Sequence, residues 1–431
     1  MKKLAYGFLS IVALMLLVVG CSKSTNDDAS SLLRTVPADA SSVVMLNVAH
    51  VVDRLGGSTD GTKIKLSKDL QKTIDESQAL KPEDKQRLKD ICDGETGIAI
   101  GSVVFFSAAR SYVTGLLNDP EKFVAYLQKE TGSQVREEDG GKVIDKTAVI
   151  GNQFWYCTTG TPDMEQLKYY QQLNEKQSYT SADASQLLLE ADKAMTYVAD
   201  VSRSLAFVPN AGYMKMASSL IFNDMAYVAG SADIQKNSIV GDASVLNSDM
   251  KPAQLLIPVE KIDASLIKKF ENGGDIYFAA GISKKLVKKI SDLASTVMGS
   301  NAQIAASVLE AIDGTVAVRA DAAASSCEAL VQTSGKNFNE LSSVLQSLFG
   351  LVVTRDGDIM TAVYGNKDFS GNITPGEAAD KLKGAWVGMV SDGFFARDVT
   401  TVMKLTVEKK SLRLDFEADG GVDALINAIT K

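Results

Sequence analysis

Apolar residues along this chain recur in two rhythms, which predicts a protein built from both strands and helices. Residues 42–48 form a β-branched, apolar run bounded by turn formers, as in a buried strand, and a helical pattern starts at Val51. The same strand-then-helix unit returns at residues 275–281 with 284–298, and more loosely at 194–200 with 202–207.

Two further helices are marked by proline and acidic residues at their starts. One begins at Asp119-Pro120-Glu121 and runs through Glu130, and the other begins near Pro162-Asp163 and runs through Leu173. Proline fits the first helical turn because its missing N–H would be unpaired there, and carboxylates favour the positive end of a helix.

Other segments alternate with period two and predict antiparallel edge strands. These are residues 154–159, residues 225–229 with 238–243, and residues 401–407 with 412–417. In the last pair, polar residues such as Lys404, Arg413 and Asp415 alternate with apolar neighbours, so one face of this hairpin should be exposed to solvent. The mixture predicts an α+β fold: antiparallel sheets with helices on one face.

Two parts of the chain resemble each other. Residues 88–100 and 309–318 each read as a helix end, an Asp-Gly turn and an apolar strand. Asp93 and Asp313 are 220 residues apart, and the strand starts Ser42 and Asp275 are 233 apart. The similar offsets predict two related halves, which we place at residues 35–260 and 261–431, each an α+β domain; the alternative is that such common units recur independently.

The first residues have the pattern of a bacterial lipoprotein signal. Lys2 and Lys3 precede an apolar run over residues 4–19, and Gly20 precedes Cys21. The run is shorter than the roughly 20 residues of a spanning helix, which disfavours a plain signal anchor. We therefore predict a signal peptide over residues 1–20, lipid attachment at Cys21, and a flexible polar tether over residues 21–34.

The net charge limits the classes of partner, and the cysteine content limits the number of disulfide bridges. The net charge is −8 and the leader removes two lysines, so nucleic acid is not expected as a partner. Besides Cys21 the chain has Cys92, Cys157 and Cys327, an odd and widely spaced set that allows at most one bridge. We favour three buried thiols over a bridge, with their pairing left open.

His50 is the single histidine, which excludes every catalytic or metal-binding mechanism that needs two histidines. It lies at a predicted strand-to-helix junction among apolar neighbours, so we interpret it as a partly buried structural residue. Ser265 and Lys268 match the S-x-x-K spacing, yet no accompanying motif follows them.

Loop motifs give no cofactor or metal site. The glycines of residues 94–101 lack the order of a phosphate-binding loop and mark a strand entry instead. Residues 355–358 have too few oxygen ligands for a calcium loop and predict a hairpin turn. We assign no catalytic, cofactor-binding or metal-binding residue, and we expect no cofactor.

The chain resembles an uncharacterised family of lipoproteins from Bacteroidetes, a domain-of-unknown-function group. The resemblance rests on the signal ending in Cys21, the opening Val36-Pro37-Ala38-Asp39-Ala40-Ser41-Ser42-Val43-Val44 and the strand-helix rhythm after it. It implies lipid anchoring in the bacterial outer membrane. Asp27-Asp28 is a weak match to a surface-display signal, so a periplasmic and a surface-exposed location both stay open.

The leading functional hypothesis is a non-enzymatic envelope lipoprotein that binds or scaffolds an unidentified protein or glycan partner. The alternative is a carboxylate-based secreted hydrolase acting on glycans, because such chemistry needs only an acid and a base. Sugar sites usually stack on exposed aromatic rings, whereas Trp155 and Trp386 both lie in patterns typical of a core. An apolar-ligand carrier is a third hypothesis that no sequence feature favours or excludes.

Overall fold

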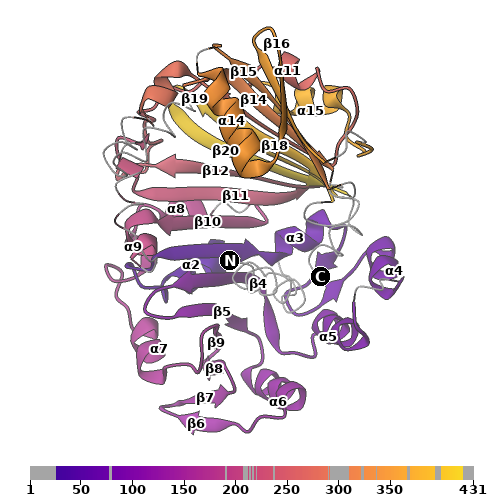
Figure 1. Ribbon diagram of the computed structural model, residues 1–431. Helices are drawn as coiled ribbons and strands as arrows, with labels where there is room; N and C mark the ends of the chain where they lie inside the picture. The colour runs from indigo at the N-terminus through magenta and orange to yellow at the C-terminus, as the bar shows by residue number, and fades with distance from the viewer. Residues whose placement is uncertain are drawn as a thin grey trace. The chain divides into compact units, whose positions relative to one another are not determined.

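The protein is described by a computed structural model over residues 26–76, 80–189, 192–206, 212, 215, 218–219, 221–235, 238–289, 291, 310–321, 325–335, 337–365, 369–393 and 399–420. The predicted signal peptide and the predicted lipid-attachment residue Cys21 lie outside the described residues. The chain divides into unit 1, Met1–Lys215, Met225–Lys251 and Gly420–Lys431, and unit 2, Met216–Asp224 and Pro252–Asp419 (Figure 1). The predicted α+β class is confirmed. The division falls after Lys251 rather than after residue 260, and Phe222 joins unit 2 by bridging to Leu255.

Unit 1 is built on an antiparallel sheet with the strand order β12–β11–β10–β1–β4–β5–β9–β8–β7–β6. The predicted edge at residues 154–159 is an inner strand, β9, because β5 and β8 pair on either side of it. The strands are β1 (Ser42–Asn47), β4 (Ile98–Ser107), β5 (Ser111–Leu117), β6 (Arg136–Glu138), β7 (Gly141–Ile144), β8 (Thr147–Ile150), β9 (Gln153–Cys157), β10 (Met195–Asp200), β11 (Tyr227–Gln235) and β12 (Ser238–Leu246). A separate hairpin is formed by β2 (Ser58–Thr59) and β3 (Ile64–Lys65).

Helices cover both faces of this sheet, so the prediction of helices on one face is wrong. Successive strand residues point to opposite faces, and Val104 packs with Leu32 of α2 whereas Val103 packs with Val52 of α3 and Phe123 of α6. Both faces of β4 carry apolar side chains, and helices pack on each face to bury them. The helices are α2 (Asn26–Leu33), α3 (Val48–Arg54), α4 (Lys68–Glu76), α5 (Pro82–Cys92), α6 (Pro120–Thr131), α7 (Met164–Gln171), the 3-10 turn η1 (Tyr179–Ser181), α8 (Ser185–Leu188) and α9 (Val201–Leu205).

Unit 2 has the antiparallel strand order β20–β19–β18–β13–β14–β15–β17–β16. Here too the two faces have separate cores: Leu330 packs with α11 and α15, and the adjacent Val331 packs with α14. The elements are α11 (Ala264–Ile267), β13 (Ile276–Ile282), β14 (Ile312–Asp321), β15 (Ser326–Thr333), α14 (Phe338–Phe349), β16 (Val352–Asp356), β17 (Ile359–Tyr364), α15 (Pro375–Leu382), β18 (Val387–Asp392), β19 (Thr400–Glu408) and β20 (Ser411–Asp419).

The two units share one order of strand pairing. In unit 1, Leu46 of β1 lies between Val103 of β4 and Met195 of β10. In unit 2, Ala280 of β13 lies between Val316 of β14 and Val387 of β18. The register shifts near the start of β4 and again near the start of β14, and a helix follows the next strand in both units. This is the topology that two related halves would have, and their common origin stays a prediction.

The residues that correspond in the two strand orders are not the pair Asp93 and Asp313 that the sequence suggested. Asp93 is the C-cap of α5, whereas Asp313 lies inside β14, so these two aspartates are not equivalent. The sequence comparison aligned two Asp-Gly dipeptides that serve different local structures.

The segment predicted as a tether is partly folded, which corrects the boundary at residue 34. Helix α2 occupies Asn26–Leu33, and the side chains of Leu32 and Leu33 are fully buried in the unit 1 core. Their burial stabilises a helix whose own sequence is too short and polar to form alone.

Candidate functional site

The tyrosine pocket of unit 1 is a hollow of about 740 Å³ lined by three separate parts of the chain. Its size falls in the range of small-ligand sites, roughly 300–1,000 Å³. The loop before β1 supplies Pro37, Ala38, Asp39 and Ser41, the turn after β4 supplies Ala108 and Ala109, and the region from α7 to α9 supplies Gln166, Tyr169, Tyr170, Gln177, Arg203 and Ala206.

Helix α7 presents two adjacent tyrosines to this pocket in different ways. The helix starts at Asp163, whose carboxylate accepts from the backbone N–H of Gln166 at 3.1 Å, and Pro162 lies before the helix rather than in its first turn. Tyr170 is 4% exposed, whereas Tyr169 is 53% exposed. Neighbouring helix positions differ by about 100° around the axis, so one ring enters the core and the next forms the wall of the pocket.

The ring of Tyr170 is held rigidly by other aromatic side chains. Its centroid lies 5.8 Å from Phe106, 6.3 Å from Tyr112 and 6.4 Å from Trp155. Burial raises the pKa of the Tyr170 phenol well above its ordinary value, with a further contribution from Tyr112, so the hydroxyl stays protonated near neutral pH. That hydroxyl makes no hydrogen bond to a residue within the described ranges, which leaves it available to a ligand.

The polar groups around Tyr170 are also oriented by the protein. Gln166 accepts from the Tyr112 hydroxyl at 3.2 Å through Oε1, which leaves its NH₂ group as a donor. Gln177 accepts from the backbone N–H of Asn174 in the same way. Arg203 donates from Nη1 to the carbonyl of Ala38 at 3.1 Å, while its Nε lies 3.5 Å from Asp200.

Asp39 supplies the negative charge of the pocket. It is the single carboxylate in the described lining, it is exposed, and it has no hydrogen bond to another described residue. The tyrosine pocket therefore combines an acceptor, several fixed donors, a hydroxyl that does both, and an exposed ring.

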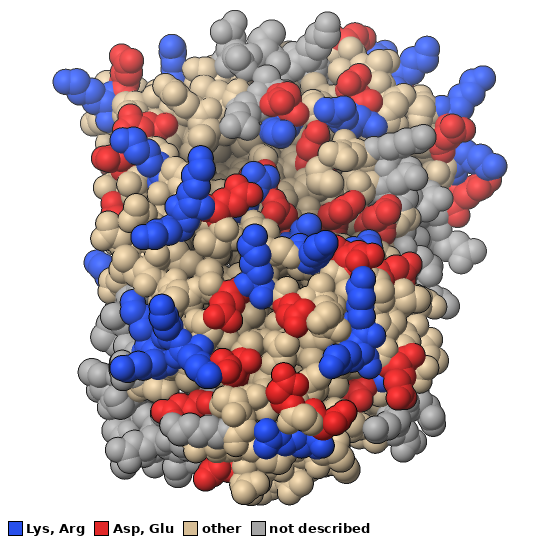
Figure 2. Space-filling view, turned by 90° about the horizontal axis from the view of Figure 1, so that it is seen from above, with Lys and Arg blue, Asp and Glu red and all other residues tan. Residues whose placement is uncertain are grey.

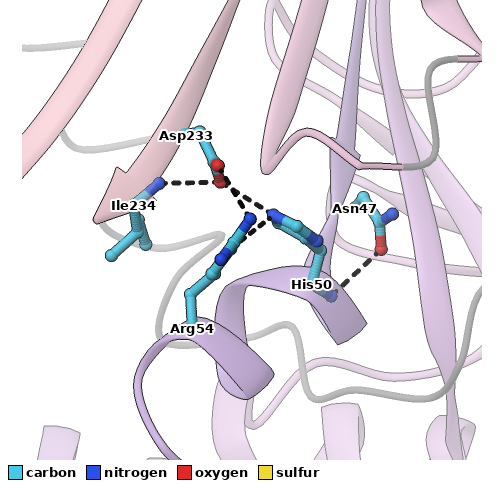
Figure 3. Close-up of polar contacts among 5 residues, drawn as sticks. All are labelled: Asn47, His50, Arg54, Asp233 and Ile234. Atoms are coloured by element: carbon cyan, nitrogen blue, oxygen red, sulfur yellow. Dashed lines mark hydrogen bonds and ion pairs between the residues drawn. The ribbon is translucent and has the colours of Figure 1, made fainter. Parts of the chain in front are cut away.

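His50 belongs to a different cluster, which Figure 3 shows between α3 and β11. Asn47 caps α3 by accepting from the backbone N–H of His50 at 3.2 Å, and the imidazole Nε2 lies 2.7 Å from Oδ1 of Asp233. Arg54 approaches the same carboxylate, with Nη2 3.3 Å from Oδ2. The Nε of Arg54 also lies 3.1 Å from His50 Nε2, and one ring nitrogen cannot donate to Asp233 and accept from Arg54 at once.

The sequence prediction of a partly buried histidine at the strand-to-helix junction is confirmed, since the side chain of His50 is 14% exposed. No serine, threonine or cysteine side chain of the described residues hydrogen-bonds to its ring. The cluster ties α3 to β11, and it lacks the nucleophile that a catalytic triad would need.

The other sequence candidates have local structural roles. The Ser265 hydroxyl donates to Asp263 at 2.7 Å at the start of α11, and residues 355–358 close the hairpin of β16 and β17, with Gly357 and Asp358 as its turn. Cys92, Cys157 and Cys327 are free thiols, of which Cys157 is fully buried and the other two are half-buried. Among the described residues, no group of metal-ligating side chains and no helix able to cross a membrane was found.

The aromatic residues illustrate what sequence reasoning missed. Trp155 is fully buried, as its core pattern predicted, whereas Trp386 is half-buried and donates to the carbonyl of Gly281 at 3.0 Å. The exposed ring of Tyr169 was not predicted. The signal available was the pair Tyr169-Tyr170 on an amphipathic helix, where only one of the two could enter the core.

Comparisons with known proteins give little beyond this geometry. No protein-family model matches the chain, and no curated protein matches it. One solved structure, described as crystal form I of TP0453, is similar at 9% identity, with 81% of this chain and 95% of that chain covered and a TM-score of 0.27. Similarity at that level supports no argument about function, and the resemblance to the Bacteroidetes lipoproteins stays a prediction.

Proposed function

We propose that this chain is an outer-membrane lipoprotein, acylated at Cys21, that binds a saccharide in the tyrosine pocket without cleaving it. The observation that carries the proposal is Tyr170, a largely buried residue of the pocket lining whose hydroxyl has no hydrogen bond to a described residue. This hydroxyl is not among the fully buried polar atoms that lack a partner, so water reaches it and a ligand hydroxyl can take the place of that water.

The chemistry of the lining favours a sugar. Each sugar hydroxyl both donates and accepts, which matches Asp39 as acceptor, Gln166 and Arg203 as donors and Tyr170 as either. The exposed face of Tyr169 offers the apolar C–H face of a sugar ring a surface to stack on. Most glycoside hydrolases use two carboxyl groups, and the described lining has one, so binding is favoured over hydrolysis.

The anchor and the pocket are tested separately. For the anchor, Cys21→Ala should move the protein from the membrane fraction to the soluble fraction, and mass spectrometry of the wild-type N-terminus should find acyl chains. For the pocket, the mature chain should bind members of a glycan array, and Tyr170→Phe should weaken that binding by up to about ten-fold, the effect of one lost hydrogen bond.

A matched pair of tyrosines provides the control. Tyr169→Ala should weaken binding, whereas Tyr364→Ala should not, although both side chains are 53% exposed. Equal effects of the two variants, or no bound glycan, would reject the saccharide site. Release of reducing sugar from a bound glycan would show the hydrolase alternative instead.

A further inference from the structure

A second hollow in unit 1, the lysine groove, has a volume of about 1,030 Å³ and lies between β3, α4 and α5. Its lining includes five lysines, Lys65, Lys68, Lys72, Lys85 and Lys89, against three acids, Asp75, Glu76 and Asp93. The chain as a whole carries a charge of −8, so a local excess of positive charge is a distinct feature. On the face drawn in Figure 2, by comparison, basic and acidic side chains are interspersed.

Only some of these lysines form hydrogen bonds or ion pairs with other groups of the protein. Lys85 donates to the backbone carbonyl of Asp75 at 2.6 Å, and Lys72 lies 3.9 Å from Glu76. Lys65, Lys68 and Lys89 make neither an ion pair nor a hydrogen bond with the described parts of the chain. These three ammonium groups are therefore free to meet an anionic ligand.

Apolar side chains also line the groove. Ile64, Leu66, Ile74 and Leu88 line the groove, and Ile74 belongs to a small core cluster with Leu70 and Leu80. Cys92 lines it as well, and burial followed by the nearby Asp93 raises the pKa of this thiol to about 11, so it adds no negative charge near neutral pH. A groove lined by both ammonium groups and apolar side chains fits a molecule that carries phosphate next to hydrocarbon.

A series of contacts links the lysine groove to helix α2, the described segment that follows Cys21 in the sequence. Helix α2 starts at Asn26, five residues after Cys21, a stretch that can span at most about 18 Å. The carboxylate of Asp28 in α2 lies beside Gly101, and the neighbouring Ile100 donates to the carbonyl of Gly61 at 3.1 Å. Gly61 belongs to the β2–β3 hairpin, which contributes Ile64 and Lys65 to the groove.

We propose that the lysine groove binds the phosphate of anionic lipid headgroups in the membrane that holds Cys21. The inference rests on the proposed lipid anchor for its biological setting, while the binding itself depends only on the groove. It gives unit 1 a second membrane contact, and lipid anchoring combined with basic residues is a stronger attachment than either alone.

Vesicle binding of the unacylated mature chain, residues 21–431 with Cys21→Ala, tests the groove separately from the anchor. It should sediment with vesicles of phosphatidylglycerol and phosphatidylcholine and not with phosphatidylcholine alone. The triple variant Lys65→Gln, Lys68→Gln, Lys89→Gln should reduce partitioning on the order of 100-fold, since each surface lysine contributes about five-fold.

A charge-matched control removes Lys129, Lys146 and Lys176 of unit 1, which lie outside the groove. This control should retain most of the binding, and thermal melts should show that both triple variants are folded. Equal losses in the two triple variants would attribute binding to net charge and overturn the proposal. Binding of inorganic phosphate to the groove, measured by calorimetry, without sedimentation on phosphatidylglycerol vesicles would identify a soluble phosphate ligand and overturn it as well. An unacylated Cys21 in cells would reject the anchor and leave the vesicle result standing.

Discussion

Arg319 in β14 and Glu328 in β15 are direct cross-strand partners, and Nε and Nη2 of the arginine donate to one carboxylate oxygen at 3.0 and 2.5 Å. The guanidinium is 3% exposed and lies 3.9 Å from the ring centroid of Phe369. At the corresponding register of unit 1, Phe106 and Tyr112 are partners with ring centroids 5.8 Å apart. One position of a shared topology thus holds an ion pair in one unit and an aromatic pair in the other.

Breaking this ion pair should destabilise unit 2 strongly. Arg319→Met leaves the buried Glu328 carboxylate without its partner, which should lower the free energy of unfolding by about 3–5 kcal/mol. Denaturant titration measures the change. Adding Glu328→Leu should restore much of the loss, because the unpaired buried charge is then gone.

A surface pair in the same unit is the control for that prediction. Arg413 lies 2.7 Å from Asp415, but its side chain is 54% exposed, so Arg413→Met should cost less than about 1 kcal/mol. Similar losses at both sites would contradict the interpretation that burial sets the cost.

The cap of α15 should make a measurable contribution to stability. The Thr374 hydroxyl accepts from the backbone N–H of Glu377, and the Glu377 carboxylate accepts in return from the backbone N–H of Thr374. Thr374→Ala should lower the unfolding free energy by about 1 kcal/mol, while Thr374→Ser keeps the hydroxyl and should cost less. An alanine variant as stable as the serine variant would show that the hydroxyl does not cap the helix.

Acid should weaken unit 2 through Asp263. Hydrogen bonds from Ser265 and then Gln332 hold the pKa of this carboxyl below its ordinary value. A folded-state pKa below the unfolded one gives stability that is present above about pH 4 and is lost as pH falls through the folded value. Denaturation midpoints measured from about pH 5 down to 2 should fall less in Asp263→Asn than in wild type. Parallel curves for the two proteins would reject this role.

The three described cysteines should react as free, protected thiols. Cys157 is fully buried, and burial raises the pKa of the half-buried Cys92 to about 11 and raises that of Cys327. Because the thiolate is the reactive form, alkylation near pH 8 should be slow in the native protein and complete after unfolding. Rapid labelling of Cys92 in the native state, located by peptide mass mapping, would contradict this.

Much of the local structure was determined by the sequence itself. The run at residues 42–48 became β1, the pattern at 275–281 became β13, and the cap at Asp119-Pro120 began α6 as predicted. The hairpin of β19 and β20 was found from alternation and from its short polar turn, where Lys409 and Lys410 take positive φ values of 48° and 67°. These features depend on residues a few positions apart, so the sequence pattern records them directly.

Tertiary structure decided the rest, because it depends on segments far apart in the chain. Helix α2 was predicted as a tether, and only its packing beside β4 explains why Leu32 and Leu33 are buried. The tyrosine pocket joins residues near 37, 108, 170 and 203, and which of Tyr169 and Tyr170 is exposed follows from how α7 packs on the sheet. Periodicity identifies the apolar side of each element, whereas the order of the strands decides which polar groups meet.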